Sequence, residues 1–110
     1  MSLSTSIHEE MDALRAAYRR ALPGKIAELG EVLDALYRAP EDAVHLLDAQ
    51  FQAHTLRGTA GSFGFPEIST TAGRIEDLLR ELRRGRVAAH GGTARLRLAF
   101  EGLRQLLGAV

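Results

Sequence analysis

The imidazole of His54 is the side chain whose sequence neighbours most suggest chemistry. On a helix that turns by about 100° per residue, His54 points away from the apolar side of its segment. Four residues share its face at helical spacing: Gln50, Arg57, Gly58 and Gly61. Each glycine costs a helix about 1 kcal/mol relative to alanine. The glycines either clear space for another protein to reach the imidazole or allow close packing within the domain. Their spacing is equally compatible with both explanations.

A carboxylate is predicted to lie beside His54. The segment Gly64-Phe65-Pro66 is typical of a turn between two helices, and His54 and Glu76 are equally far from Phe65 along the chain. Residues equidistant from the turn of an antiparallel pair lie side by side, so Glu76 can accept a hydrogen bond from the imidazole Nδ1–H. That bond would fix the tautomer and leave the Nε2 lone pair facing outward. Arg57, one turn away, can offer a cation to an incoming phosphoryl group. These groups suit phosphorylation at Nε2.

Two other hypotheses fit a helical histidine. A metal-binding bundle would use His8, His45, His54 and His90, but these residues are scattered and have no cysteine beside them. A non-catalytic helical adaptor would bind partner proteins through this face without transferring phosphate. From the residues alone, an ordinary surface histidine remains open as well.

The elements that must position His54 are predicted to be helices, because apolar residues recur at helical spacing throughout the chain. The expected ranges are 5–21, a segment ending near 39–40, 40–63, 66–85, and a last helix capped by Thr93 after a loop at 85–92. Pro23-Gly24 interrupts or kinks the first helix, and the first two segments could be one bent helix. The predicted fold is all-α: an antiparallel four-helix bundle with an additional or kinked N-terminal helix. Within range 40–63, the expected buried residues are Leu46, Ala49, Ala53, Leu56, Ala60 and Phe63.

Composition narrows the class of protein. The 110 residues suit a single domain, 1–110, with 45% hydrophobic and 25% charged residues. No apolar run approaches the roughly 18 residues of a membrane span, and the N-terminus does not have the pattern of a signal peptide. Cysteine is absent and the formal net charge is zero, which argues against disulfides and bulk nucleic-acid binding. A cytoplasmic monomer is expected. The arginines at 80, 83, 84 and 86 are interpreted as a solvated helix end, or as an aid to docking an acidic partner.

The segment from Ala53 to Phe65, AHTLRGTAGSFGF, resembles the signature of histidine-phosphotransfer domains. The letters GSFGF are especially similar to the phosphotransfer domain of chemotaxis-type histidine kinases. The resemblance implies that His54 is the phosphorylation site and that Glu76 orients its imidazole. It also implies that Arg57 stands where the family usually has lysine, and that Gly58 is the small residue flanking the ring.

The resemblance further implies partners. A sensor histidine kinase and response-regulator receiver domains would exchange phosphate with His54, and the receiver would bring the Mg²⁺, so no cofactor is expected on this chain. The docking face is expected to include Gln50, Arg57, Gly58 and Gly61, with apolar contact from Leu47, Phe51 or Phe65. The chain has no nucleotide-binding glycine motif, so it is not expected to phosphorylate itself from ATP.

Overall fold

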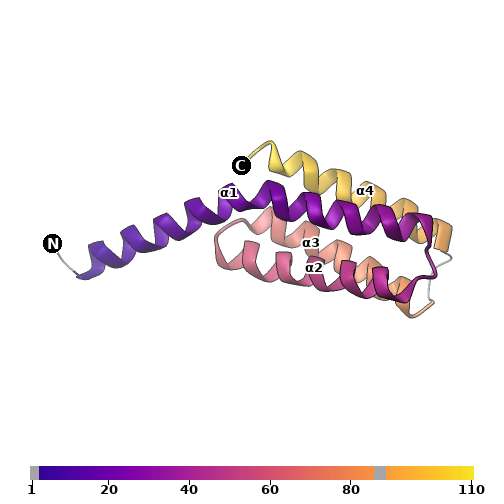
Figure 1. Cartoon of the computed structure of the whole chain (residues 1–110). Coiled ribbons are helices and arrows are strands. Elements are labelled where there is room, and N and C mark those ends of the chain that lie inside the picture. The colour runs from indigo at the N-terminus through magenta and orange to yellow at the C-terminus, as the bar shows by residue number, and fades with distance from the viewer. Residues whose placement is uncertain (1–2, 86–88) are drawn as a thin grey trace.

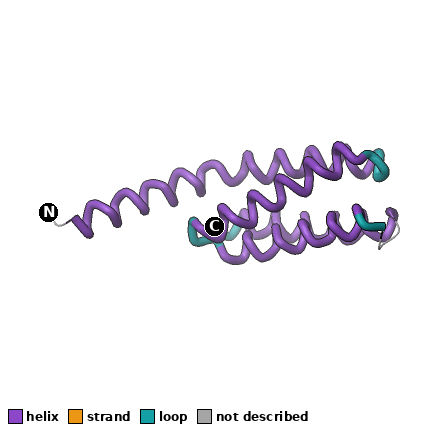
Figure 2. Tube along the Cα trace, turned by 90° about the horizontal axis from the view of Figure 1, so that it is seen from below, coloured by secondary structure: helices purple, strands orange, loops and turns teal. Residues whose placement is uncertain are grey.

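Residues 3–85 and 89–110 are described by a computed structural model, and every regular element in them is a helix. The elements are α1 (Leu3–Arg38), α2 (Ala43–Ser62), α3 (Pro66–Arg83) and α4 (Ala89–Leu107). The four pack as an antiparallel bundle, and the first part of α1 projects beyond its end (Figures 1 and 2). We call residues 6–17 the arm, because Tyr18 is the first buried side chain among those described in α1. The predicted all-α bundle is confirmed.

The first helix is continuous through Pro23, so the first two predicted segments form one helix and the interruption expected at Pro23-Gly24 is absent. At about 1.5 Å per residue its 36 residues span roughly 54 Å, which accounts for most of the 58 Å length of the molecule. Proline cannot donate to the carbonyl one turn earlier, that of Arg19. Both residues are exposed, so water can reach that carbonyl. Leu22 and Ile26 on either side are buried, and their packing holds the helix in place.

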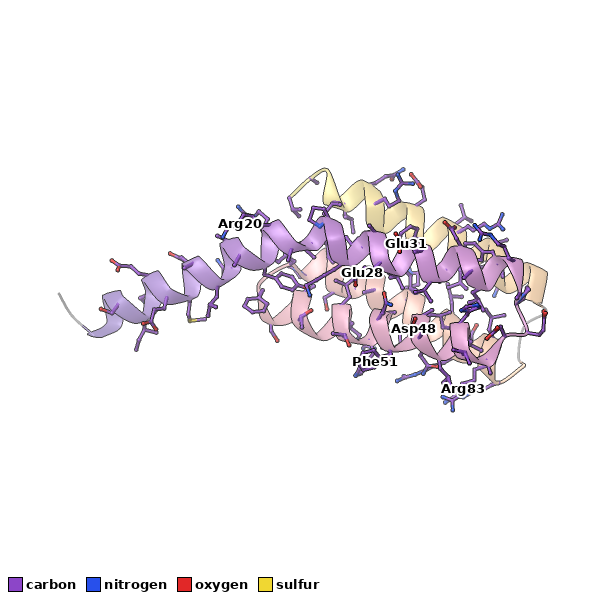
Figure 3. The ribbon with its side chains drawn as sticks, in the orientation of Figure 1. Arg20, Glu28, Glu31, Asp48, Phe51 and Arg83 are labelled. Carbon is purple, nitrogen blue, oxygen red and sulfur yellow. The ribbon has the colours of Figure 1, made fainter. Side chains whose placement is uncertain are left out.

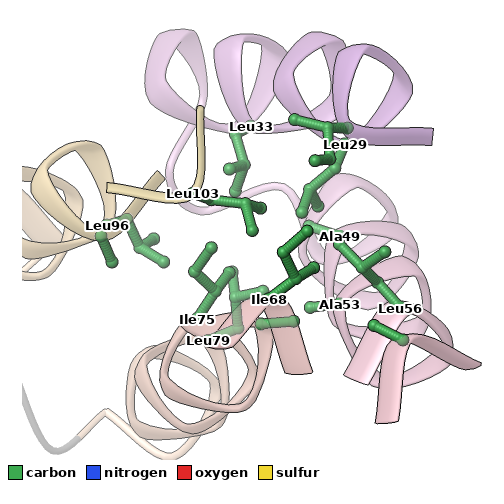
Figure 4. Packing of buried hydrophobic residues seen from close by; sticks show 14 of the residues in the cluster. Leu29, Leu33, Ala49, Ala53, Leu56, Ile68, Ile75, Leu79, Leu96 and Leu103 are labelled. Atoms are coloured by element: carbon green, nitrogen blue, oxygen red, sulfur yellow. The ribbon is translucent and has the colours of Figure 1, made fainter. Parts of the chain in front are cut away.

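The core lies between the second half of α1 and the other three helices, as Figure 4 shows. Leucines and isoleucines fill its centre, and small residues of α2 let that helix approach closely. Gly30 allows a similar approach between α1 and α4, because a Cβ there would lie 2.8 Å from the Phe100 ring. The fully buried large apolar residues are Leu22, Leu29, Leu33, Leu36, Ile68, Ile75, Leu79, Leu96 and Leu103.

The turn between α2 and α3 sets the register of the two helices. Gly64 has a φ of +86°, which favours glycine, and the Phe65 N–H donates to the Ala60 carbonyl at 2.8 Å. This pattern is the Schellman motif that ends many helices. Pro66 begins α3, where its missing N–H costs nothing. The Tyr18 ring stacks on Phe63 with centroids 4.7 Å apart, so α1 packs against this turn.

Two helix boundaries differ from the predicted ones. The third predicted helix was expected to open at Pro40, but α2 begins at Ala43, and Asp42 caps it by accepting from the backbone N–H groups of Val44 and His45. The last helix begins at Ala89, so Thr93 lies inside it and is not its cap. Gly92 and Thr93 are buried, and this packing outweighs the helix cost of glycine. Residues 86–88 of the predicted loop lie outside the described ranges.

Candidate functional site

The predicted contact between His54 and Glu76 is present. The imidazole Nδ1 lies 2.7 Å from Glu76 Oε2, across the α2–α3 interface. The two side chains differ greatly in exposure: that of His54 is 65% exposed and that of Glu76 is 1% exposed. An ionised carboxylate can only accept, so Nδ1 carries the hydrogen, and in the neutral imidazole the lone pair then lies on Nε2. The arrangement presents one nucleophilic nitrogen to solvent and holds the other in place.

The buried Glu76 carboxylate is held by two arginines. Arg57 Nη1 donates to Oε1 at 3.2 Å, and Arg80 Nη2 forms an ion pair with Oε2 at 2.9 Å. Burial of an unpaired carboxylate would be costly, and these two cations together with the imidazole N–H offset that cost. Oε2 is therefore shared by Arg80 and His54, and Oε1 binds Arg57.

Gly73 makes room for Arg57. A Cβ at this buried glycine of α3 would lie 3.2 Å from both Cδ and Nε of Arg57. That distance is tighter than ordinary van der Waals contact, so a side chain here would press on the arginine that reaches Glu76. The bare stretch of α3 beside the site thus lets the Arg57 side chain cross the helix surface.

The two glycines of α2 beside His54 have different surroundings. A Cβ at Gly58 would meet nothing within 4 Å, so this position opens onto solvent. A Cβ at Gly61 would lie 3.1 Å from Ser69 Oγ, which itself donates to the Arg57 carbonyl at 2.7 Å. Of the two explanations left open by the sequence, cleared space fits Gly58 and close packing fits Gly61.

An open depression lies beside the imidazole. Its lining combines apolar and cationic side chains from α2 and α3: Leu47, Gln50, Phe51, His54, Glu76, Arg80 and Arg83. Phe51 is 69% exposed, and Val44 and Leu47 precede it on the same face of α2. We call Val44, Leu47 and Phe51 the α2 row. Figure 3 shows Phe51 and Arg83 extending from the same side of the molecule.

Comparison with known proteins identifies the family. The Hpt domain family matches residues 3–109. This chain belongs to the Hpt domain family. It is also 31% identical over 93 residues to the chemotaxis protein CheA of Halobacterium salinarum (strain ATCC 29341 / DSM 671 / R1). That match covers 84% of this chain and 14% of the relative. No solved structure matches the chain.

Membership places the chain in histidine phosphotransfer and two-component signalling. No helix in the described part of the Hpt domain is both long and apolar enough to cross a membrane. Within those same residues, no three His, Cys, Asp or Glu side chains gather where they could hold a metal ion. The side chain of His90, one of the four histidines considered for a metal site, lies outside the described residues.

Phe65 is the one residue of the expected docking face that the Hpt domain structure contradicts. It is 7% exposed and its ring lies 5.8 Å from that of Tyr18. The Schellman turn directs it inward, so its packing stabilises the bundle and leaves no surface for a partner. Gln50 lines the depression, while Arg57 and Gly58 are exposed beside it.

Sequence reasoning missed the role of Arg80. It was interpreted as part of a solvated helix end or as an aid to docking an acidic partner, yet it binds the buried carboxylate of Glu76. The signal was present, because Arg80 follows Glu76 by four residues, the spacing at which helical side chains meet. The role of Gly73 was also not predicted, because it depends on Arg57 lying across that glycine.

Proposed function

We propose that His54 accepts a phosphoryl group from, and returns it to, aspartates of response-regulator receiver domains. The observation that carries this proposal is the 2.7 Å contact between Nδ1 and Glu76, made by an imidazole whose side chain is 65% exposed. A buried carboxylate orients the ring, and the remaining nitrogen faces outward. A sensor histidine kinase upstream supplies the phosphate to the pathway.

In the forward step, the Nε2 lone pair attacks the phosphorus of the aspartyl phosphate in line. The Nε2–P bond forms, the P–O bond breaks, and the aspartate leaves as a carboxylate. Positive charge develops on the imidazole, and Glu76 stabilises it through Nδ1–H. The reverse reaction returns the phosphoryl group. Positioning and electrostatics lower the barrier, and the receiver supplies its Mg²⁺.

The α2 row and Gly58 are suited to docking. Val44, Leu47 and Phe51 are between 47% and 74% exposed, and this apolar row runs along α2 toward His54. Gly58, on the other side of the histidine, has no side chain that would keep a partner away from the helix surface. A partner that covers the row would exclude water from the imidazole, which strengthens the electrostatic interactions there.

The test is incubation with a phosphorylated receiver domain. Acid-labile, base-stable label should appear on the wild type and disappear in His54→Ala. His45→Ala is the matched control, because His45 lies on the same helix and its Nε2 lies 3.7 Å from the cap residue Asp42, at the start of that helix. Absence of transfer across a broad receiver panel would favour the non-catalytic adaptor. A parallel incubation with labelled ATP alone should give no label.

A further inference from the structure

Two adjoining depressions on the α2–α3 face share the same three side chains. Gln50, Arg80 and Arg83 line both the depression beside His54 and a second one that Arg84 completes. Arg57 lines neither of them. Its guanidinium binds Glu76 Oε1, and its stem crosses Gly73. The cations that border the space beside the imidazole therefore come from α3.

The charge of this surface is not balanced. Glu76, the acidic residue in the lining, is already bound by Arg57 and Arg80. Arg83 forms no ion pair with any residue that the structure describes, and the Gln50 Oε1 is buried without a hydrogen-bond partner. Two arginines facing one paired carboxylate leave excess positive charge at the site. Guanidinium groups of this kind bind phosphate oxygens through charge-assisted hydrogen bonds.

We propose that Arg80 and Arg83 contact the phosphoryl oxygens on His54 Nε2, and that Arg57 acts through Glu76. This inference rests on the proposed function and adds to it the residues that hold the anion. It reassigns the phosphate contact from Arg57, where helical spacing placed it, to α3. Arg80 then binds both Glu76 and the phosphoryl group. Arg83 binds the phosphoryl group but not Glu76.

A small donor separates contact with the phosphoryl group from docking of a protein. With phosphoramidate, the Nε2 lone pair attacks phosphorus, the Nε2–P bond forms, the P–N bond breaks and ammonia leaves. No partner surface takes part. A slower reaction in an arginine variant then reports on the anion itself or on the orientation of the imidazole.

Arg83→Gln is the decisive variant, because Arg83 does not touch Glu76. We expect labelling by phosphoramidate to slow about three- to tenfold in Arg83→Gln, and at least as much in Arg80→Gln. Arg74→Gln is the matched control: Arg74 is exposed on α3 and lines neither depression. Circular dichroism checks that each variant is folded.

A second measurement distinguishes anion contact from orientation. Nearby cations favour the phosphoryl dianion, so its ³¹P resonance should titrate at a lower pH in the wild type than in Arg83→Gln. Arg57→Gln should slow labelling but leave that titration unchanged. If Arg83→Gln and Arg80→Gln match Arg74→Gln in both rate and titration, the inference is wrong. If the wild type itself takes no label, the proposed function fails and this inference with it.

Discussion

Two rows of apolar side chains are exposed on this domain, and they differ in origin. The α2 row is Val44, Leu47 and Phe51, and the arm row is Ile7, Met11 and Leu14. The arm row continues the stripe of α1 that is buried from Tyr18 onward, and it is exposed because the bundle ends there (Figure 1). The α2 row lies off the stripe that α2 buries, which includes Ala49 and Ala53.

The difference shows that exposure alone does not mark a functional surface. The α2 row leads to a nucleophile, a buried carboxylate and two arginines within one depression. The arm row lines neither the depression beside His54 nor the adjoining one. We therefore expect substitutions near the α2 row to change phosphotransfer, and substitutions on the arm to leave it unchanged.

The largest effect is expected from Glu76→Gln, which keeps the shape of the side chain and removes its charge. The amide stabilises the developing imidazolium less and can present the wrong group to Nδ1, so phosphorylation of His54 should slow about ten- to a hundredfold. Transfer kinetics from a phosphorylated receiver measure this. Glu67→Gln, exposed on α3, should behave as the wild type. Equal rates in both variants would show that orientation by Glu76 is unimportant.

The comparison between the two rows is tested directly by Phe51→Ala and Met11→Ala. Both residues are more than half exposed. Phe51→Ala should weaken receiver binding about tenfold, because a central aromatic contact is lost, but labelling by phosphoramidate should stay normal. Met11→Ala should change neither. Titration calorimetry with the receiver gives the dissociation constants, and a defect in Met11→Ala of similar size would show that the arm also binds the partner.

Smaller effects are expected at Gly58, where one substitution should raise stability and a longer one should slow phosphotransfer. Alanine there meets no neighbour, so the free energy of unfolding should rise by about 0.5–1 kcal/mol. A longer side chain in Gly58→Gln should keep the fold and slow transfer from the receiver, while labelling by phosphoramidate is unaffected. Chemical denaturation and transfer kinetics measure the two quantities. Unimpaired transfer in Gly58→Gln would mean that the partner does not approach over this position.

The smallest effect concerns the start of the α2 row. Hydrogen bonds from the backbone N–H groups of His45 and Val44 hold the pKa of Asp42 below its ordinary value. The pKa is lowered in the folded state, so the stabilisation is present above the ordinary aspartate pKa and is lost as pH falls through the folded value. Asp42→Asn can still cap the helix and should reduce the loss of stability between about pH 5 and 2. Thermal unfolding across that range measures the slope, and identical slopes would contradict the assignment.

The pairing of residues in the α2–α3 hairpin could be predicted, because it follows from the number of residues between each position and the turn. Once Gly64 and Pro66 mark the turn, residues at equal distance on either side face each other, and the sequence therefore predicts the contact between His54 and Glu76. The same register brings Arg57 to Gly73 and Gly61 to Ser69. Those two contacts were not predicted, because a glycine contributes no side chain from which a partner can be inferred.

Other features could not be predicted from the sequence, because they depend on contacts between helices that are distant along the chain. The start of α4 was placed five residues too late, because Gly91-Gly92 in the predicted loop resembles a turn until the burial of Gly92 and Thr93 is known. Phe65 was placed on the surface because an aromatic residue after a turn can face either way, and contact with Tyr18 of a distant helix decides its direction. Arg80 was interpreted as part of a solvated helix end or as an aid to docking, because it belongs to a run of arginines, and its ion pair with Glu76 follows from the burial of that carboxylate.

The Gly64 turn has a consequence for protein design. The nucleophile and its orienting carboxylate are brought level here by the turn and by equal chain lengths, since each lies eleven residues from Phe65. Two helices joined by this turn, with the arginines that accompany Glu76, form a segment that could be transplanted into another bundle without the arm. Deleting one residue from the turn would shift one helix past the other and separate the pair, even though neither member had been changed.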